Sequence, residues 1–275
     1  MITAIRARLF QGHRTMRYPL EPVSLPEYFR GYPRFSGTPC PPGCRECADI
    51  CPVGAISCSP SRAIDLGKCL FCTKCGMACP QESISFSNDA CLATNRREEL
   101  IAGPEHERKL AKALDAKMLS LFGRSIKFRE VSAGGCNACE ADTNVLSTIG
   151  WDLGRFGIQF VASPRHADGL WLTGPVTQHM IEAIRITYEA IPAPKIVIAC
   201  GACAISGGPF IDSPEVCNGI DTMLPVDLYI PGCPPHPLTI LDGLLRLLNK
   251  SAPFLAATNA VARHPAKSIT SLAAL

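Results

Sequence analysis

The sequence predicts an α/β protein with a small cysteine-rich α+β domain and, after it, a larger domain built on a parallel sheet. Two observations carry this prediction. Cysteines recur in two tandem runs in the first third of the chain. In the second half, short apolar runs alternate with segments of helical periodicity, which is typical of a parallel sheet covered on both faces. The expected segments are an arm at 1–38, the cysteine-rich domain at 39–95, a helical linker at 96–123, the sheet domain at 124–250 and a tail at 251–275.

The downstream cysteine run follows the pattern C-x2-C-x2-C-x3-C-P. In bacterial ferredoxins this run holds a [4Fe–4S] cluster, and its fourth cysteine ligates a second cluster. The partner run lies just upstream and also ends in Cys-Pro. The crossover rule predicts one cluster on Cys40, Cys44, Cys47 and Cys79, and another on Cys69, Cys72, Cys75 and Cys51.

The upstream run departs from the pattern at its first spacing. Three residues separate Cys40 from Cys44, where the pattern has two, and Gly43 gives the backbone the freedom to bulge there. Cys40 remains the best first ligand. Cys58 and Cys91 lie outside both runs, and we interpret them as buried free thiols that behave as small hydrophobic residues.

In a parallel sheet the functional loops collect at the carboxyl ends of the strands. We expect strands at 126–131, 158–161, 170–172, 195–199 and 227–230, and helices at 141–149, 177–190 and 237–248. Cysteines beside glycine or proline follow three of these strands, so they should meet at one edge. We predict a third [4Fe–4S] cluster on Cys136, Cys139, Cys203 and Cys233, with Cys200 as the alternative to Cys203. Structural zinc is the other occupant considered, and the eight ferredoxin-type cysteines favour iron and sulfide.

Composition excludes several classes of protein. A net charge of +3 is near balance and disfavours nucleic acid as the main partner. Sixteen cysteines would indicate disulfides in a secreted protein, but the first ten residues lack the apolar core of an export signal. We therefore interpret the thiols as metal ligands in a reducing compartment. No apolar stretch reaches the ~18 residues that span a bilayer, so we expect no direct membrane span.

Two further segments have their own patterns. Residues 1–38 are rich in proline, arginine and aromatic residues, which prevents a continuous helix and predicts an extended arm lying on another surface. In residues 105–122, apolar side chains recur at spacings of three and four, and Gly123 follows at a C-cap position. This periodicity predicts a helix between the two domains.

The chain resembles two known families joined end to end. Through 18–22, 29–31 and 69–72, residues 18–88 resemble the ferredoxin-like subunit of formate hydrogenlyase and its complex I relative. Residues 121–248 resemble the small subunit of energy-converting (group 4) [NiFe] hydrogenases, which is related to the 20 kDa subunit of complex I. The stretches that carry this second resemblance are 135–140, 155–158, 163–168, 173–177, 201–203, 206–208 and 231–235.

The resemblance implies a dicluster ferredoxin domain followed by a flavodoxin-like sheet domain, with three [4Fe–4S] clusters in all. It also implies that the third cluster lies beside a [NiFe] centre in a separate large subunit. The spacing Cys136-x2-Cys139 is of the hydrogenase type, because quinone-reducing relatives carry adjacent cysteines there.

Four charged residues near the predicted third site have two interpretations each. Glu140 and Asp142 belong either to a proton route or to the start of a helix, where acids are favoured. The family usually has Glu at the position of Asp142, which places a proton-route role in doubt. Arg165 and His166 either tune the third cluster or cap a strand end.

We therefore expect a non-catalytic electron-transfer subunit of an oxidoreductase complex, bound to a [NiFe] large subunit and to other soluble and membrane subunits. The expected location is cytoplasmic, on the inner face of the membrane through those partners. One alternative is a complex I-like or hydrogenase-related assembly that has lost nickel. The other is a stand-alone ferredoxin-like carrier or iron–sulfur sensor.

Overall fold

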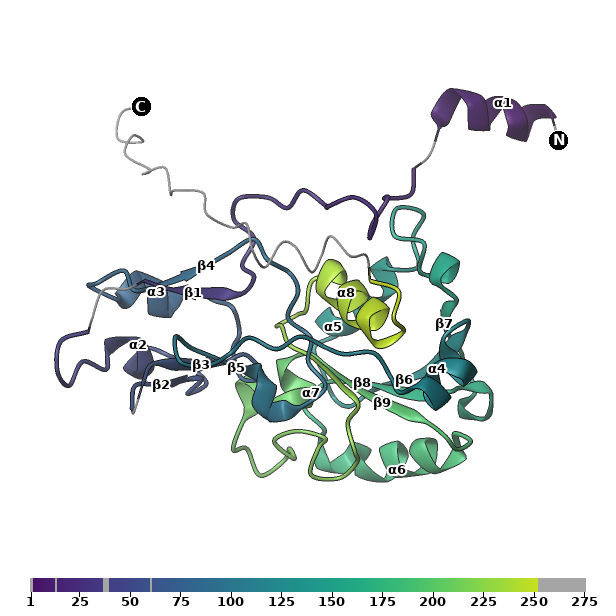
Figure 1. Ribbon diagram of the computed structural model, residues 1–275. Helices are drawn as coiled ribbons and strands as arrows, with labels where there is room; N and C mark the ends of the chain where they lie inside the picture. Colours follow the sequence, from purple (N-terminus) through teal and green to yellow (C-terminus); the bar gives the residue numbers. More distant parts are fainter. Residues whose placement is uncertain (1, 13, 37–39, 60, 252–275) are drawn as a thin grey trace.

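The computed structural model describes residues 2–12, 14–36, 40–59 and 61–251, which form two regions side by side (Figure 1). We call residues 40–102 the cysteine-rich region and residues 126–247 the sheet region. Nearly all of the tail predicted at 251–275 lies outside the described residues. Within the described part of the chain, no helix is both long enough and apolar enough to cross a membrane.

Five parallel strands form the sheet region in the order β10-β9-β8-β6-β7. Numbered along the chain and followed from the other edge, this order is 2-1-3-4-5, that of flavodoxin-like folds. The strands are β6 (Ile126–Ser132), β7 (Ile158–Phe160), β8 (Gly169–Thr173), β9 (Ile196–Cys200) and β10 (Leu228–Ile230). Every residue of β8, β9 and β10 is buried, as expected for a sheet covered on both faces. The predicted flavodoxin-like parallel sheet is confirmed for this region.

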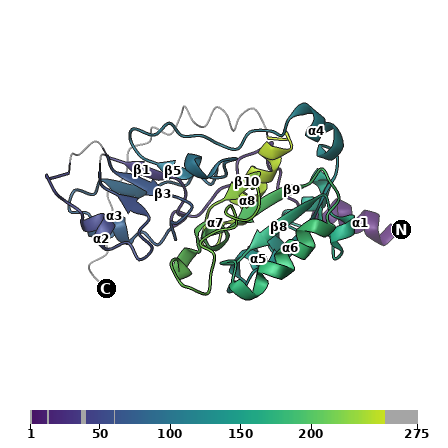
Figure 2. The ribbon, with the colours of Figure 1, turned by 90° about the horizontal axis from the view of Figure 1, so that it is seen from below.

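Helices cover the two faces of this sheet (Figures 1 and 2). Helices α5 (Ala138–Val145) and α8 (Pro237–Leu247) pack on the face that carries Trp171, and α6 (Ile181–Ala190) and α7 (Ala202–Ser206) pack on the face that carries Leu170 and Leu172. Successive strand residues point to opposite faces, so the apolar run of β8 supplies both cores. Helix α8 begins at Pro237, and the His236 Nδ1 atom accepts a hydrogen bond from the Leu238 N–H at 3.1 Å.

The cysteine-rich region consists of short helices and antiparallel strands. Strands β2 (Ile56–Ser57), β3 (Ala63–Asp65) and β5 (Ile101–Ala102) form one sheet. Strand β4 (Ile84–Phe86) pairs with β1 (Pro33–Phe35), which comes from the predicted arm. Helices α2 (Glu46–Asp49) and α3 (Lys74–Ala78) carry cysteines of the two runs and pack against one another.

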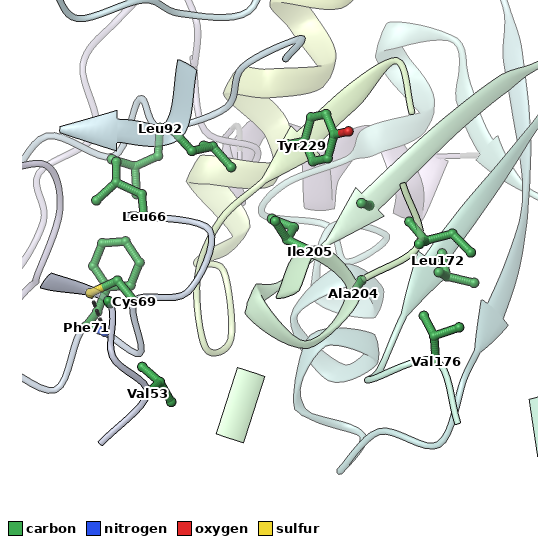
Figure 3. Packing of buried hydrophobic residues seen from close by; sticks show 14 of the residues in the cluster. Val53, Leu66, Cys69, Phe71, Leu92, Leu172, Val176, Ala204, Ile205 and Tyr229 are labelled. Atoms are coloured by element: carbon green, nitrogen blue, oxygen red, sulfur yellow. Dashed lines mark hydrogen bonds between the residues drawn. The ribbon is translucent and has the colours of Figure 1, made fainter. Parts of the chain in front are cut away.

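The two regions share one apolar core (Figure 3). Leu66 and Leu92 of the first region pack in the same cluster as Ile205 and Tyr229 of the second. The Ser206 hydroxyl donates to the Gly67 carbonyl at 2.9 Å. Residue 94 also exchanges two backbone hydrogen bonds with Tyr229, at 3.1 and 2.8 Å. A core of this kind fixes the position of one region against the other.

The prediction of an extended arm was wrong at the N-terminal end. Ile2–Gln11 forms helix α1, because the prolines begin only after it, at Pro19. At the other end, Pro33–Phe35 joins a sheet as β1. Between them, the Tyr18 hydroxyl donates to Asp242 Oδ1 of α8 at 3.0 Å, while the Arg246 Nε–H donates to Asp242 Oδ2 at 2.7 Å. This buried network ties the arm to the sheet region.

The predicted linker helix was also mostly wrong. Helix α4 covers only Ala116–Phe122, capped by Asp115, which accepts from the Met118 N–H at 2.9 Å. Before it, the chain forms a short 3-10 turn at Arg97–Leu100, the strand β5, and an irregular stretch. In that stretch the Ala111 N–H bonds to residue 93 and the Leu114 N–H bonds to residue 247, so tertiary hydrogen bonds replace those of a helix.

We predict that Tyr18→Phe destabilises the protein. The variant keeps the ring but leaves a buried carboxylate without one charge-assisted hydrogen bond, which costs about 2 kcal/mol. For a chain of this size the unfolding temperature should fall by roughly 5 °C, as measured by circular dichroism under anaerobic conditions. Tyr28→Phe is the matched control, because Tyr28 is 82% exposed. Equal unfolding temperatures for the two variants would contradict the role of the network.

Candidate metal centres

Three loops at the carboxyl edge of the sheet region bring cysteines together. Cys136 lies in the loop after β6, and Cys139 lies in the first turn of α5. Cys203 lies in α7, directly after β9, and Cys233 follows β10. The topology therefore delivers four thiols from three distant segments to one edge, as the sequence predicts.

The electrostatic influence of these thiols on one another shows that they are neighbours. Burial raises the pKa of Cys139 strongly, and the nearby Cys203, Cys233 and Cys136 raise it further. Burial, followed by Cys233 and Cys136, raises the pKa of Cys203 to about 12. Cys136 and Cys233 are exposed, whereas Cys139 and Cys203 are half-buried. Each of the four thiols is therefore close enough to others of the set to influence a pKa, and two of the four are open to solvent.

Two glycines make room for these sulfur atoms. Gly201 has a φ of +93°, and a Cβ atom at this position would lie 2.6 Å from Cys139 Sγ. Gly208 has a φ of +55°, and a Cβ atom there would lie 2.7 Å from Cys203 Sγ. Both positions need glycine for backbone conformation and for space. Thiolates are the usual ligands of iron in an iron–sulfur cluster, and backbone N–H groups close to the cluster can donate hydrogen bonds to its sulfur atoms. The residues at this edge therefore fit such a cluster.

Cys200 differs from these four cysteines because its side chain is fully buried. It ends β9, is fully buried, and belongs to the apolar core on the α8 side of the sheet. Burial raises its pKa well above the usual range, and a hydrogen bond with Thr143 acts against that shift. Cys203 lies in the first turn of α7 and is half-buried, so it is better placed than Cys200 to ligate a metal.

The second cysteine set lines one apolar cavity. Cys51, Cys69, Cys72 and Cys75 all border it, together with apolar side chains that include Val53 and Phe86. Burial raises the pKa of Cys69 to about 12, and the thiols of the other three cysteines raise it further, while a hydrogen bond from the Phe71 N–H to Cys69 Sγ at 3.3 Å acts against them (Figure 3). Cys51 comes from the other run, so this cavity brings it together with three cysteines of the downstream run.

The first cysteine set is gathered less completely. Burial raises the pKa of Cys47 to about 12, and Cys58 and Cys79 contribute to this rise. Cys58 was predicted to be a buried free thiol, but it is half-exposed and lies beside Cys47. Sequence spacing gave no sign of this neighbour. Cys40 and Cys44 are half-exposed at the start of the run.

The other predicted site residues differ in their placement. Glu140 is buried and accepts a hydrogen bond from the Thr173 hydroxyl at 2.7 Å. Burial alone would raise its pKa, but hydrogen bonds from Ser132 and Thr173 lower it. Asp142 lies in α5, and burial raises its pKa. Arg165 and His166 are exposed in the turn before β8, and among the described residues neither side chain hydrogen bonds to a cysteine.

A pocket of about 590 Å³ lies between the second and third cysteine sets. Leu70 and Phe71, from the loop between two cysteines of the second set, line one side. Cys233 and Asp142 line another side, and arm residues such as Arg30 complete it. Arg30 Nη1 donates to the Phe71 carbonyl at 3.3 Å, which attaches the arm to this loop. The loop between Cys69 and Cys72 and the loop after β10 therefore border the same pocket.

No group of three or more His, Cys, Asp or Glu side chains in the described part of the chain lies close enough to hold a single metal ion.

Comparison with known proteins gives a family match and several similar chains. Residues 136–247 match the family model described as NADH ubiquinone oxidoreductase, 20 Kd subunit. The probable membrane-bound hydrogenase subunit mbhJ of Pyrococcus furiosus is 43% identical over 146 residues, which are 53% of this chain and 87% of that protein. An NADH-quinone oxidoreductase subunit of Citrifermentans bemidjiense is 50% identical over 118 residues, which are 43% of this chain and 69% of that protein.

Among solved structures, the membrane-bound sulfane sulfur reductase, an archaeal respiratory membrane complex, contains a similar chain. It is 35% identical with a TM-score of 0.43, and the match covers 50% of this chain and 75% of that one.

We predict that Cys203→Ser removes or perturbs the electron paramagnetic resonance signal of one cluster, whereas Cys200→Ser leaves every signal in place. The physical reason is that Cys203 borders the open site and Cys200 packs in the core. Spectra of the two reduced variants provide the measurement, and each variant is the control for the other. A lost signal in Cys200→Ser alone would reverse the assignment.

Proposed function

The chain belongs to the family of the NADH ubiquinone oxidoreductase 20 kDa subunit through its sheet region, and from this premise we propose that it is the iron–sulfur electron-transfer subunit of a membrane-associated, formate hydrogenlyase-like [NiFe] hydrogenase complex. The relatives are subunits of multi-subunit oxidoreductases, so the chain is a subunit of such a complex with partner subunits of its own. The observation that carries the finer proposal is the meeting of Cys136, Cys139, Cys203 and Cys233 at one sheet edge.

In the proposed assignment, twelve cysteines hold three [4Fe–4S] clusters, and each cluster when bound takes up and releases one electron. The cysteine-rich region is then a dicluster ferredoxin domain fused to the sheet domain. The proposed sets are Cys40, Cys44, Cys47 and Cys79; Cys69, Cys72, Cys75 and Cys51; and Cys136, Cys139, Cys203 and Cys233.

The arrangement of the sets supports a relay. Phe71, from the loop between Cys69 and Cys72 of the second set, and Cys233 of the third set line a common pocket. The first set shares helix packing with the second through α2 and α3. Electrons would pass along this row, and the shared core of the two regions holds the row rigid.

A hydrogenase-type large subunit is the proposed partner for the third set. Two observations support it: the Cys136-x2-Cys139 spacing, and the 43% identity to a probable membrane-bound hydrogenase subunit. Cys136 and Cys233 are exposed, so a cluster on them would face a partner. The proton and dihydrogen chemistry would belong to that partner.

A second candidate function is electron transfer in a complex I-like or hydrogenase-related assembly without nickel. The 50% identity to a subunit of an NADH-quinone oxidoreductase favours it. Metal analysis of the co-purified large subunit distinguishes the two candidates, because only the first requires nickel.

We predict about twelve iron and twelve sulfide per chain after anaerobic reconstitution. Cys40→Ser should lower iron to about eight, whereas Cys58→Ser, the control beside Cys47, should leave it at about twelve. Iron and sulfide analysis provides the measurement. A wild-type plateau near eight iron would remove one proposed cluster, and substantial zinc would favour a structural metal instead. The opposite behaviour of the two variants would assign the ligand to Cys58.

We also predict that Cys139→Ser abolishes hydrogen-linked reduction of every acceptor by the assembled complex, because electrons leave a buried [NiFe] site through the nearest cluster. Cys72→Ser should block a protein electron donor yet spare part of the methyl viologen activity, since a small dye reaches the third cluster directly. Full activity of Cys139→Ser, or hydrogen uptake by the isolated chain, would show that the proposed relay is wrong.

A further inference from the structure

A buried junction joins the loop that carries Cys69 to the helix that carries Cys203. The Ser206 hydroxyl, at the end of α7, donates to the Gly67 carbonyl at 2.9 Å, and both residues are buried. Cys203 lies three residues before Ser206 in the chain. Cys69 lies two residues after Gly67. One hydrogen bond and two short stretches of chain therefore connect a proposed ligand of the second cluster to a proposed ligand of the third.

The junction has no spare room at Gly67. A Cβ atom at this position would lie 2.8 Å from the Arg97 guanidinium carbon and 2.8 Å from Cγ2 of Ile205, a residue of α7. Separations this short force something to shift, so an alanine here would push the loop away from Arg97 or from α7. The backbone at Gly67 is thus packed directly against both.

Arg97 holds this loop through Asp65. Its Nη1 and Nη2 groups donate to Asp65 Oδ1 and Oδ2 at 2.8 and 2.6 Å, and the two side chains are 23% and 16% exposed. Asp65 Oδ1 also accepts from the Gly67 N–H at 2.9 Å, and the Asp65 carbonyl accepts from the Cys69 N–H at 2.9 Å. An arginine that makes two parallel bonds to a carboxylate fixes orientation as well as distance. The position of the Cys69 loop against α7 therefore depends on Arg97.

A second contact between the same two cysteine sets is of a different kind. Phe71 and Cys233 line the pocket of about 590 Å³, and Cys233 is exposed, so water can enter there. The junction at Gly67 and Ser206 is instead close-packed and excludes water. Electron tunnelling decays less steeply through packed and hydrogen-bonded atoms than across a solvent-filled gap. The buried junction is the contact that favours electron transfer.

We propose that Arg97 is a positioning residue that, through Asp65 and Gly67, sets the separation of the second and third clusters. This inference rests on the proposed function, because it requires a cluster on each of the two sets. In the transfer step, one electron leaves one reduced cluster and reduces the other. Arg97 exchanges no electron, and it acts by holding the two clusters at the separation on which the transfer rate depends.

The experiment measures the magnetic interaction between the two clusters by electron paramagnetic resonance in the reconstituted full chain, with a europium(II) chelate as a strong reductant. Dipolar coupling between two spins falls steeply with their separation, so it reports relative position. In the wild type, the reduced second cluster should split or broaden the third-cluster signal. Arg97→Ala should lose this splitting, and so should Arg97→Lys, which keeps the charge without the two parallel bonds. Arg96→Ala is the matched control, because the Arg96 side chain is 72% exposed.

Gly67→Ala provides an independent variant that leaves Arg97 in place. Its added Cβ should displace the loop and change the splitting. Gly150→Ala is the control, because a Cβ atom at Gly150 meets no atom within 4 Å. Iron analysis accompanies each spectrum, and about twelve iron per chain shows that a variant has kept its clusters. If Arg97→Ala loses iron, Gly67→Ala decides the result.

The outcomes separate the two proposals. Absence of the second or third cluster in the wild type would overturn the proposed function and this inference with it. With full iron, an unchanged splitting in the Arg97 variants and in Gly67→Ala would overturn this inference and leave the proposed function standing. A lower unfolding temperature with unchanged splitting would show that Arg97 only stabilises the fold. Loss of splitting in Arg96→Ala or Gly150→Ala would also contradict the inference.

Discussion

Parallel pairing of the strands is the constraint on which the rest of this structure depends. Because β6, β9 and β10 run in the same direction, the loops that follow them leave the sheet at one edge. That edge is where four thiols meet, where Gly201 and Gly208 bring backbone close to sulfur, and where the buried Glu140 is placed. An antiparallel neighbour among these strands would carry one of the cysteines to the opposite edge.

The second constraint is the core shared by the two regions. Leu66 and Leu92 pack with Ile205 and Tyr229, and the Ser206 hydroxyl bonds to Gly67. Burial of apolar surface here fixes the loop that contains Phe71 beside the loop that contains Cys233. Electron transfer between proposed clusters depends on such fixed adjacency. Because both regions belong to one chain, this adjacency is established by folding and does not require assembly of separate subunits.

Electrostatics give the cysteine sets a common character. Burial comes first among the causes that raise the pKa values of Cys47, Cys69 and Cys203, and neighbouring thiols raise them further. Thiolates in these positions repel one another until metal neutralises them, so metal binding, proton release and folding are coupled.

The cysteine runs, the alternation of strands and helices, and the glycine-flanked loops could be predicted from the sequence alone, because each depends on residues that are neighbours in the chain. Tertiary structure decided the rest. The linker pattern before α4 did not become a helix, because hydrogen bonds to residues 93 and 247 replaced the helical ones. The contact of Cys58 with Cys47 and the pairing of β1 with β4 also join distant segments. In the sequence Glu130 is an ordinary polar strand residue, and only the structure shows that it is partly buried opposite Trp171, with an Oε1 atom that has no hydrogen-bond partner among the described residues.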